Sequence, residues 1–192
     1  MTNYLKKNYL IIISSILIVI GISTLLKDVS GFFHDSAETN LVTYENNDMK
    51  FSIKYPSNWN IEEHIGGFVT VTAPIEDYTQ TKYPAGLGVY PIKLESQNVS
   101  LSTIKNVHLE NITNNLKEFQ LIDSRPIALP GSKSAFQLIF TALDGDQIRK
   151  SMQVITKNQN IAYLITYKAD LNKYESYIKT AQKIVDSLVF IK

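Results

Sequence analysis

The stretch Met49-Lys-Phe-Ser-Ile-Lys-Tyr-Pro-Ser-Asn-Trp59 is the most informative part of the sequence about the fold. Apolar side chains occupy alternate positions in it, which is the period of a β-strand with one buried and one wet face. These alternating residues are Phe51, Ile53 and Tyr55. Residues 46–48, Asn-Asn-Asp, tolerate the backbone of a tight turn, so we expect a hairpin there. Pro56 should end the strand, and Trp59 is large enough to fill the edge of a core.

Beyond this stretch, the pattern predicts strands on both sides of one helix. Residues 69–72 and 86–94 have strand character, and the polar segment 75–85 between them should be a surface loop. Residues 101–116 change to a helical period, with Ser100 placed as the N-cap. His108 lies on or beside the apolar stripe, where we expect a half-buried packing residue. Residues 119–129 read as a strand in which Pro126 indicates an edge or a bulge.

Three strands are predicted in succession after residue 135. Apolar residues alternate up to Asp144-Gly145-Asp146 and alternate again after it. A two-residue turn at residues 144–145 would put the two apolar sets on opposite faces, whereas a three-residue loop pairs Phe136 with Val154 and Leu138 with Met152. We therefore predict the odd loop or a bulge. A turn at residues 158–159 would then pair Val154 with Tyr163 and Met152 with Ile165.

The opposite face of these strands is also apolar, so both faces of the sheet need cover. A final helix with a clean apolar stripe supplies part of it, with Asp170 as a candidate cap. The stripe consists of Tyr174, Tyr177, Ile178, Ala181, Val185 and Leu188. Residues 189–191 should form a short extended tail against the sheet. The order strands, helix, strands, helix predicts an α+β sandwich around a mainly antiparallel sheet.

The N-terminal region contains an uncharged apolar run from Leu10 to Leu26, preceded by Lys6 and Lys7. With residues 8 and 9 it is just long enough to cross a bilayer, and lysines ahead of a first span usually stay in the cytoplasm. We therefore expect a cytoplasmic end at 1–8, a transmembrane signal anchor at 9–26, a stalk at 27–43, and an extracytoplasmic domain at 44–192. A cleaved signal peptide is the rival interpretation, although Leu25-Leu26-Lys27-Asp28 is a poor cleavage site.

Composition limits the classes of function. The chain has 192 residues and no cysteine, so disulfide and thiolate chemistry are absent. About 150 residues follow the anchor and stalk, enough for one domain with its own core. From Asp28 onward there are 16 basic and 18 acidic residues, a net charge of −2. A nucleic-acid partner needs a strongly basic face, so this balance argues against one.

Residues 49–59, closing in Tyr55-Pro56-x-x-Trp59, resemble the opening of PsbP-like domains. The similarity continues through a helix opening on Ser-Leu, three strands ending in Ile-Ala-Tyr-Leu-Ile-Thr-Tyr, and a last helix ending in Ile-Val-Asp-Ser-Leu-Val-Phe. It covers about residues 44–192 and implies the Mog1/PsbP-like α/β/α sandwich, here in a membrane-anchored form typical of a non-photosynthetic microbe. Plant members of the family help photosystem II retain calcium and chloride, and many microbial relatives have no assigned role.

Candidate metal ligands gather at Glu62-Glu63-His64. Neighbouring strand residues point to opposite faces, so only Glu62 and His64 could converge. Glu76 and Asp77 are the nearest further carboxylates, and such an oxygen-rich set would suit calcium or manganese. An exposed polar edge is the favoured explanation of the same residues, because they have no defined ligand spacing. No cofactor is otherwise indicated.

The remaining motifs favour a non-enzymatic protein. The sequence has no Gly-x-Ser-x-Gly elbow and no His-Glu-x-x-His motif, and Asp144-Gly145-Asp146 fits a hairpin turn better than a calcium loop. Asn98 and Asn111 begin N-glycosylation sequons, which have meaning only on an outer surface. The leading hypothesis is an accessory or binding module at the membrane face that assists a membrane protein complex, with loop 75–85 as its contact. The alternative is a binder of a small ligand or a divalent cation.

Overall fold

The hairpin predicted around residues 46–48 is present. In the computed structural model, which describes residues 40–75 and 83–191, strand β1 (Leu41–Asn46) pairs antiparallel with β2 (Phe51–Pro56). Strand β1 therefore includes the last three residues that we assigned to the stalk. All three are exposed, so no apolar alternation marks them as a strand.

The expected membrane anchor at residues 9–26 lies outside the described residues. Within residues 40–75 and 83–191, neither helix has the length and apolar character that crossing a membrane requires.

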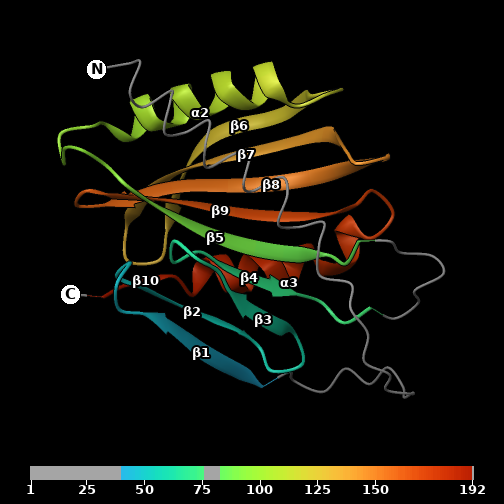
Figure 1. The fold of residues 1–192 in the computed structure, drawn as a ribbon, viewed down its shortest axis with the longest axis horizontal. Helices are drawn as coiled ribbons and strands as arrows, with labels where there is room; N and C mark the ends of the chain where they lie inside the picture. Colours follow the sequence, from blue (N-terminus) through green and yellow to red (C-terminus); the bar gives the residue numbers. More distant parts are fainter. Residues whose placement is uncertain (1–39, 76–82, 192) are drawn as a thin grey trace. The chain divides into compact units, whose positions relative to one another are not determined.

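A seven-stranded antiparallel sheet forms the centre of the domain, in the order β3-β4-β5-β9-β8-β7-β6 (Figure 1). Its strands are β3 (Asn60–Glu63), β4 (Val69–Thr72), β5 (Gly86–Lys93), β6 (Gln120–Leu129), β7 (Lys133–Asp144), β8 (Gln147–Asn158) and β9 (Ile161–Asp170). Strand β6, which contains Pro126, is an edge strand as predicted, and its pairing with β7 shifts between Leu121 and Asp123. A proline is compatible with this position because an edge strand has one unpaired side.

The C-terminal tail is strand β10 (Val189–Phe190), which pairs with β2. Together β1, β2 and β10 form a second, three-stranded sheet. The tail is extended, as expected, but it joins this small sheet rather than the large one.

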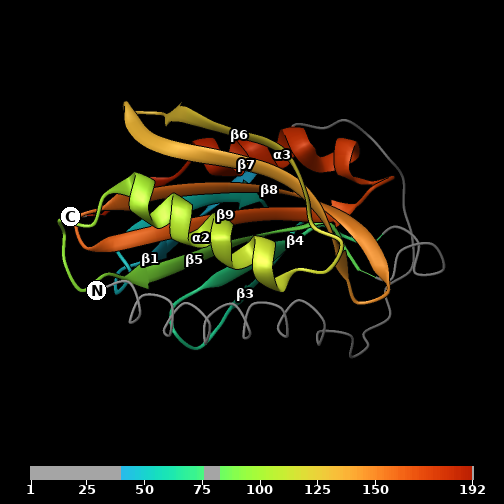
Figure 2. The ribbon, with the colours of Figure 1, turned by 90° about the horizontal axis from the view of Figure 1, so that it is seen from above.

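Two helices cover opposite faces of the large sheet (Figure 2). Helix α2 (Leu101–Asn115) begins at Ser100, whose Oγ accepts a hydrogen bond from the Thr103 backbone N–H at 3.0 Å, as the N-cap prediction requires. Helix α3 (Tyr174–Asp186) lies on the other face and also contacts β2 of the small sheet. Asp170 does not cap α3. Asp170 is the last residue of the strand before it, and its carboxylate lies 3.1 Å from the Arg149 guanidinium, whereas the N-cap position is Lys173.

The register between β7 and β8 differs from the prediction. A two-residue turn at Gly145-Asp146 pairs Ile139 with Met152, so Leu138 lies opposite Gln153. The odd loop was therefore wrong. Both faces of β7 carry apolar residues, so the alternation of apolar residues is compatible with either pairing register. The geometry of the turn sets the register instead. Gly145 has φ of +65°, as the first central residue of a type II′ turn requires.

The β8–β9 pairing preserves the predicted face but not the predicted partners. Met152 pairs with Tyr167 and Val154 with Ile165, two residues away from the expected register. Because side chains alternate with a period of two, a shift of two leaves the same residues on the same face.

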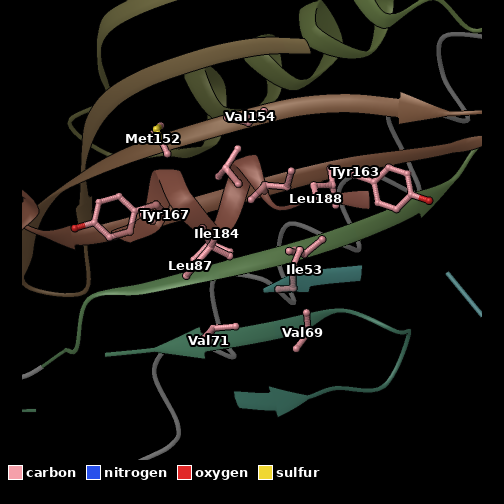
Figure 3. Close-up of a cluster of buried hydrophobic side chains, with 14 of the residues drawn as sticks. Ile53, Val69, Val71, Leu87, Met152, Val154, Tyr163, Tyr167, Ile184 and Leu188 are labelled. Atoms are coloured by element: carbon pink, nitrogen blue, oxygen red, sulfur yellow. The ribbon is translucent and has the colours of Figure 1, made fainter. Parts of the chain in front are cut away.

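The main core lies between the large sheet, α3 and the small sheet (Figure 3). Each of these three elements contributes fully buried side chains to it. They include Ile53 from β2, Val69 and Val71 from β4, Leu87 from β5, Met152 and Val154 from β8, Tyr163 and Tyr167 from β9, Ile184 from α3, and Leu188 just after α3. The alternation at residues 51–55 is explained by this arrangement, because Phe51 and Ile53 face α3 and the large sheet while Lys54 is exposed.

Candidate functional site

Two hairpin turns from different sheets meet at one end of the domain. We call residues 44–50 and 62–68 together the double-hairpin end. The side chain of the buried Asn46 connects the two turns. The Asn46 Nδ2 donates to the Gly67 carbonyl oxygen at 3.1 Å, and its Oδ1 accepts from the Met49 backbone N–H at 2.8 Å. The same Nδ2 also donates to the Tyr44 hydroxyl at 3.2 Å. One side chain therefore holds the β1–β2 turn, the β3–β4 turn and β1 together.

The β3–β4 turn has a defined backbone. The His64 N–H donates to the Phe68 carbonyl at 2.9 Å, and the Gly67 N–H donates to the His64 carbonyl at 3.1 Å. Gly66 and Gly67 both have positive φ, which glycine adopts without strain. A Cβ on Gly67 would lie 2.7 Å from the Met49 Cγ, whereas one on Gly66 would meet nothing within 4 Å. Glycine at 67 therefore allows the two turns to approach closely.

This turn presents an apolar side chain to solvent. Ile65 is 100% exposed, while the rings behind it are packed. The His64 and Phe68 rings stack with centroids 4.4 Å apart and planes 10° apart, and Phe68 in turn stacks on Tyr90 at 5.4 Å. The exposed isoleucine thus directly follows a histidine whose ring is held in this stack.

The charges around this end are mainly acidic. Glu45, Asp48, Glu62 and Glu63 are exposed there, and Lys50 is the basic residue among them. Glu63 also reaches the hydroxyl of Tyr44. Burial, followed by the hydrogen bond to Glu63, raises the pKa of Tyr44 to about 12. The phenol is therefore neutral at physiological pH and acts as a hydrogen-bonding link between β1 and β3.

The predicted cation ligands divide between the described and undescribed parts of the chain. Glu62 lies opposite Thr70 in the β3–β4 pair, and the His64 Nε2 is 2.9 Å from the Thr70 hydroxyl oxygen. These two residues therefore flank the same threonine. Glu76 and Asp77 lie outside the described residues, as does most of loop 75–85. Within residues 40–75 and 83–191, no three His, Cys, Asp or Glu side chains are placed to hold a metal ion. The cation site stays a prediction.

The opposite end of the sheet contains a buried ionic cluster that we did not predict from sequence. The guanidinium of Arg149, 1% exposed, lies 3.1 Å from the Asp170 carboxylate and 3.2 Å from that of Asp144, and it donates to the Pro84 carbonyl at 3.1 Å. The Lys168 Nζ is 2.6 Å from the same Asp144 oxygen. The only signal in the sequence was a set of charged residues near the ends of otherwise apolar strands.

The charges of this cluster balance, with two basic and two acidic groups. Burial tends to raise the pKa of the Asp144 carboxyl, but Lys168 and Arg149 outweigh it, and the pKa lies below its usual value. The Asp144 carboxyl is therefore ionised at neutral pH, and its charge lies between the Lys168 Nζ and the Arg149 guanidinium. This arrangement closes the end of β7, β8 and β9, and each of its charges already has a partner.

The structure also shows the packing and exposure of the other residues that the sequence analysis named. Trp59 is buried and packs edge-on against Tyr177 of α3, with ring centroids 5.9 Å apart. Tyr55 is half-buried and Pro56 is buried at the end of β2. The two candidate glycosylation sites also differ in exposure: Asn98 is exposed before α2, whereas Asn111 is half-buried on the helix and accepts a hydrogen bond from Asn115.

A family model described as PsbP-like protein matches residues 9–190. The chain belongs to the PsbP-like family. The match begins at the start of the N-terminal apolar run and ends in β10, so it includes that run as well as the domain. No functionally curated protein is similar enough in sequence to match the chain.

Solved structures agree with a PsbP-like fold. The cyanobacterial PsbP of Synechocystis sp. PCC 6803 has a TM-score of 0.59 at 15% identity, over 83% of this chain and 98% of that one. PA94 from Pseudomonas aeruginosa has a TM-score of 0.57 at 13% identity, over 78% and 96%. LpqN of Mycobacterium tuberculosis, which is involved in cell envelope biogenesis, has a TM-score of 0.57 at 14% identity, over 80% and 91%.

Proposed function

We propose that this PsbP-like protein is a non-enzymatic accessory module that is anchored in a membrane through residues 9–26. Its domain would bind a membrane protein complex on the extracytoplasmic side. The observation that carries the proposal is the extent of the family match, which takes in the apolar run together with the domain. The inclusion of the run in the family's matched region supports an anchor over a chance apolar segment.

The lengths of the segments support tethering. The domain begins at Asn40, whose carbonyl accepts a hydrogen bond from the Ser57 N–H at 2.8 Å. The 14 residues from Lys27 to Asn40 span at most about 50 Å when fully extended. A domain held on so short a connection would stay close to the membrane, where an integral membrane protein is within reach.

The setting of a structural neighbour is consistent with this role. LpqN has the same fold and is involved in cell envelope biogenesis. A tethered domain outside the cytoplasm would work in the same kind of environment. The double-hairpin end, with its exposed Ile65, offers a surface suited to binding.

Membrane anchoring is tested with the full chain carrying a C-terminal tag. We expect it to stay in the membrane pellet after alkaline carbonate extraction and its domain to be digested by protease added to spheroplasts. The variant Ile16→Lys/Val19→Lys should be extracted, because each central lysine costs about 3 kcal/mol of insertion free energy. The matched control Ile16→Leu/Val19→Leu should stay in the pellet. A wild-type chain that carbonate extracts, or a domain that protease cannot reach, would contradict anchoring.

Complex binding is tested by purifying the tagged chain from native membranes in a mild detergent. We expect an integral membrane protein to co-purify at a constant ratio to the chain. If the chain is recovered alone after chemical crosslinking in intact cells, the accessory role is wrong.

A further inference from the structure

We propose that the double-hairpin end is the partner-binding face of the domain. Ile65 would enter an apolar pocket of a protein, and Lys or Arg residues of that protein would border the pocket. This inference rests on the proposed accessory function and names the surface and the chemistry by which it operates.

The first argument is rigidity. A surface that is ordered before binding loses little conformational entropy when a partner arrives. The double-hairpin end has this property, because Asn46 links both turns and the Gly67 backbone packs against Met49. A fully exposed isoleucine on such a fixed turn differs from one on a loosely held loop, since its position is already defined.

The second argument is the shape of the apolar surface. Binding energy in protein interfaces concentrates in a few apolar anchors that fill pockets. Ile65 is fully exposed, and the half-buried rings of His64 and Phe68 belong to the same turn. The two edges of the large sheet, β3 and β6, are protected against the addition of a strand. Strand β6 has a register shift and Pro126, and β3 is short with two glutamates, and such features normally prevent strand addition.

Charge decides the class of partner. The exposed Glu62 and Glu63 immediately precede the turn, and Glu45 and Asp48 lie on the adjoining hairpin. An anionic lipid surface would repel these carboxylates, so insertion of Ile65 into a membrane is disfavoured. A protein pocket with a basic rim complements them and gains both attraction and orientation.

Orientation agrees with a partner that extends outward from the membrane. Asn40, where the anchor-bearing segment joins the domain, lies at the start of β1, and the β1–β2 turn lies at its other end (Figure 1). The length of β1 therefore separates the point of attachment from the double-hairpin end.

The test places a photo-crosslinking amino acid at Ile65 of the full chain, in the cells that produce it. The control places the same group at Leu171, an apolar residue 52% exposed in the turn that follows β9, at the other end of the large sheet. We expect a protein crosslink from position 65 that is absent from position 171. The partner peptide joined to position 65 should contain apolar residues together with Lys or Arg.

Charge reversal then tests the complementarity. Glu62→Lys/Glu63→Lys should reduce the crosslink from position 65 by at least about tenfold. The control Glu95→Lys/Glu175→Lys changes the net charge equally on other surfaces and should leave the yield unchanged. Replacing the basic residues of the partner peptide by glutamate should restore crosslinking to Glu62→Lys/Glu63→Lys, which a folding defect could not explain.

Several outcomes would overturn the inference. They are crosslinks from position 65 to lipid, equal yields from positions 65 and 171, or insensitivity to Glu62→Lys/Glu63→Lys. The proposed function fails separately, by loss of membrane retention or of a co-purifying membrane protein in the wild-type chain. A wild-type chain that retains both, with its crosslinks from another surface, contradicts only the assignment of this face.

Discussion

His108 shows how a single buried side chain can make stability depend on pH. It is 1% exposed, so our expectation of a half-buried residue was wrong, and its Nε2 is 2.6 Å from the Gln153 Oε1. The helical stripe located the residue correctly but could not show that the sheet beneath α2 encloses it. Burial lowers the pKa of His108 to about 4, although the hydrogen bond to Gln153 partly opposes this.

We predict that acidification destabilises the domain through His108. The folded pKa lies below the unfolded value, so the unfolded chain binds a proton that the folded one excludes. The free energy of unfolding should therefore fall by about 3 kcal/mol as the pH drops from about 7 to about 4. Urea denaturation across this range measures it.

The variant His108→Gln should lose this slope between pH 6.5 and 4.5, whatever its stability at pH 7. His64→Gln is the matched control, because the His64 ring is only half-buried, and it should keep the slope. A wild-type slope equal to that of His108→Gln would contradict the assignment.

The ionic cluster leads to a second prediction, which compares a buried pair with an exposed one. Asp170→Asn leaves the fully buried Arg149 with less compensation, and we expect a loss of about 2–3 kcal/mol of unfolding free energy. Glu175→Gln removes the same type of charge from an exposed pair with Lys150 and should cost less than about 1 kcal/mol. Denaturation at pH 7 measures both, and equal losses would show that burial adds nothing.

The β3–β4 turn of the large sheet lies directly against the β1–β2 turn of the small sheet, where Gly67 approaches Asn46 and Met49. We predict that Gly67→Ala destabilises the domain more than Gly66→Ala. Both positions have positive φ and share that strain, about 1 kcal/mol, but only at 67 does the new Cβ meet Met49 at 2.7 Å. Thermal unfolding should show a larger drop in Tm for Gly67→Ala.

A double-mutant cycle identifies the cause. Met49→Ala should remove the excess cost of Gly67→Ala while leaving the cost of Gly66→Ala unchanged. If Met49→Ala has the same effect on both glycine variants, the two turns are not coupled through this contact.

The β7–β8 pair shows why the pairing register of two strands is harder to predict from sequence than their boundaries. No bounds were predicted for β3, but for the other strands the boundaries followed from alternation and turn residues, and they were right to within a few positions. The pairing was not, because Ile139 and Leu138 are both apolar and either could face the main core. Only where one face of a strand is polar does the pattern specify the register.

For the domain as a whole, we predict that residues 40–192 fold without the N-terminal segment. They form one compact unit, which contains the buried core of the described part of the chain. Circular dichroism and the fluorescence of Trp59, the only tryptophan, should give coincident denaturation curves for this fragment. Trp59 reports on the contact with α3, so separate transitions would show that α3 and the large sheet unfold independently.

The amino-acid sequence already contained the elements, the two-helix antiparallel plan and the resemblance to PsbP-like proteins. These follow from local properties, namely periodicity, turn-forming residues and the Ser100 cap, which neighbouring residues determine among themselves. The start of β1 was not predicted, because its first three residues are all exposed and show no alternation.

Only the tertiary structure determined which distant residues meet. The Asn46–Gly67 hydrogen bond joins residues 21 apart, and the Arg149–Pro84 bond joins residues 65 apart. Such pairs leave no periodic trace, because each partner is compatible with its own strand or turn whether or not the other is present. The double-hairpin end and the ionic cluster therefore arise from the packing of the two sheets and the closing of strand ends, which local sequence does not encode.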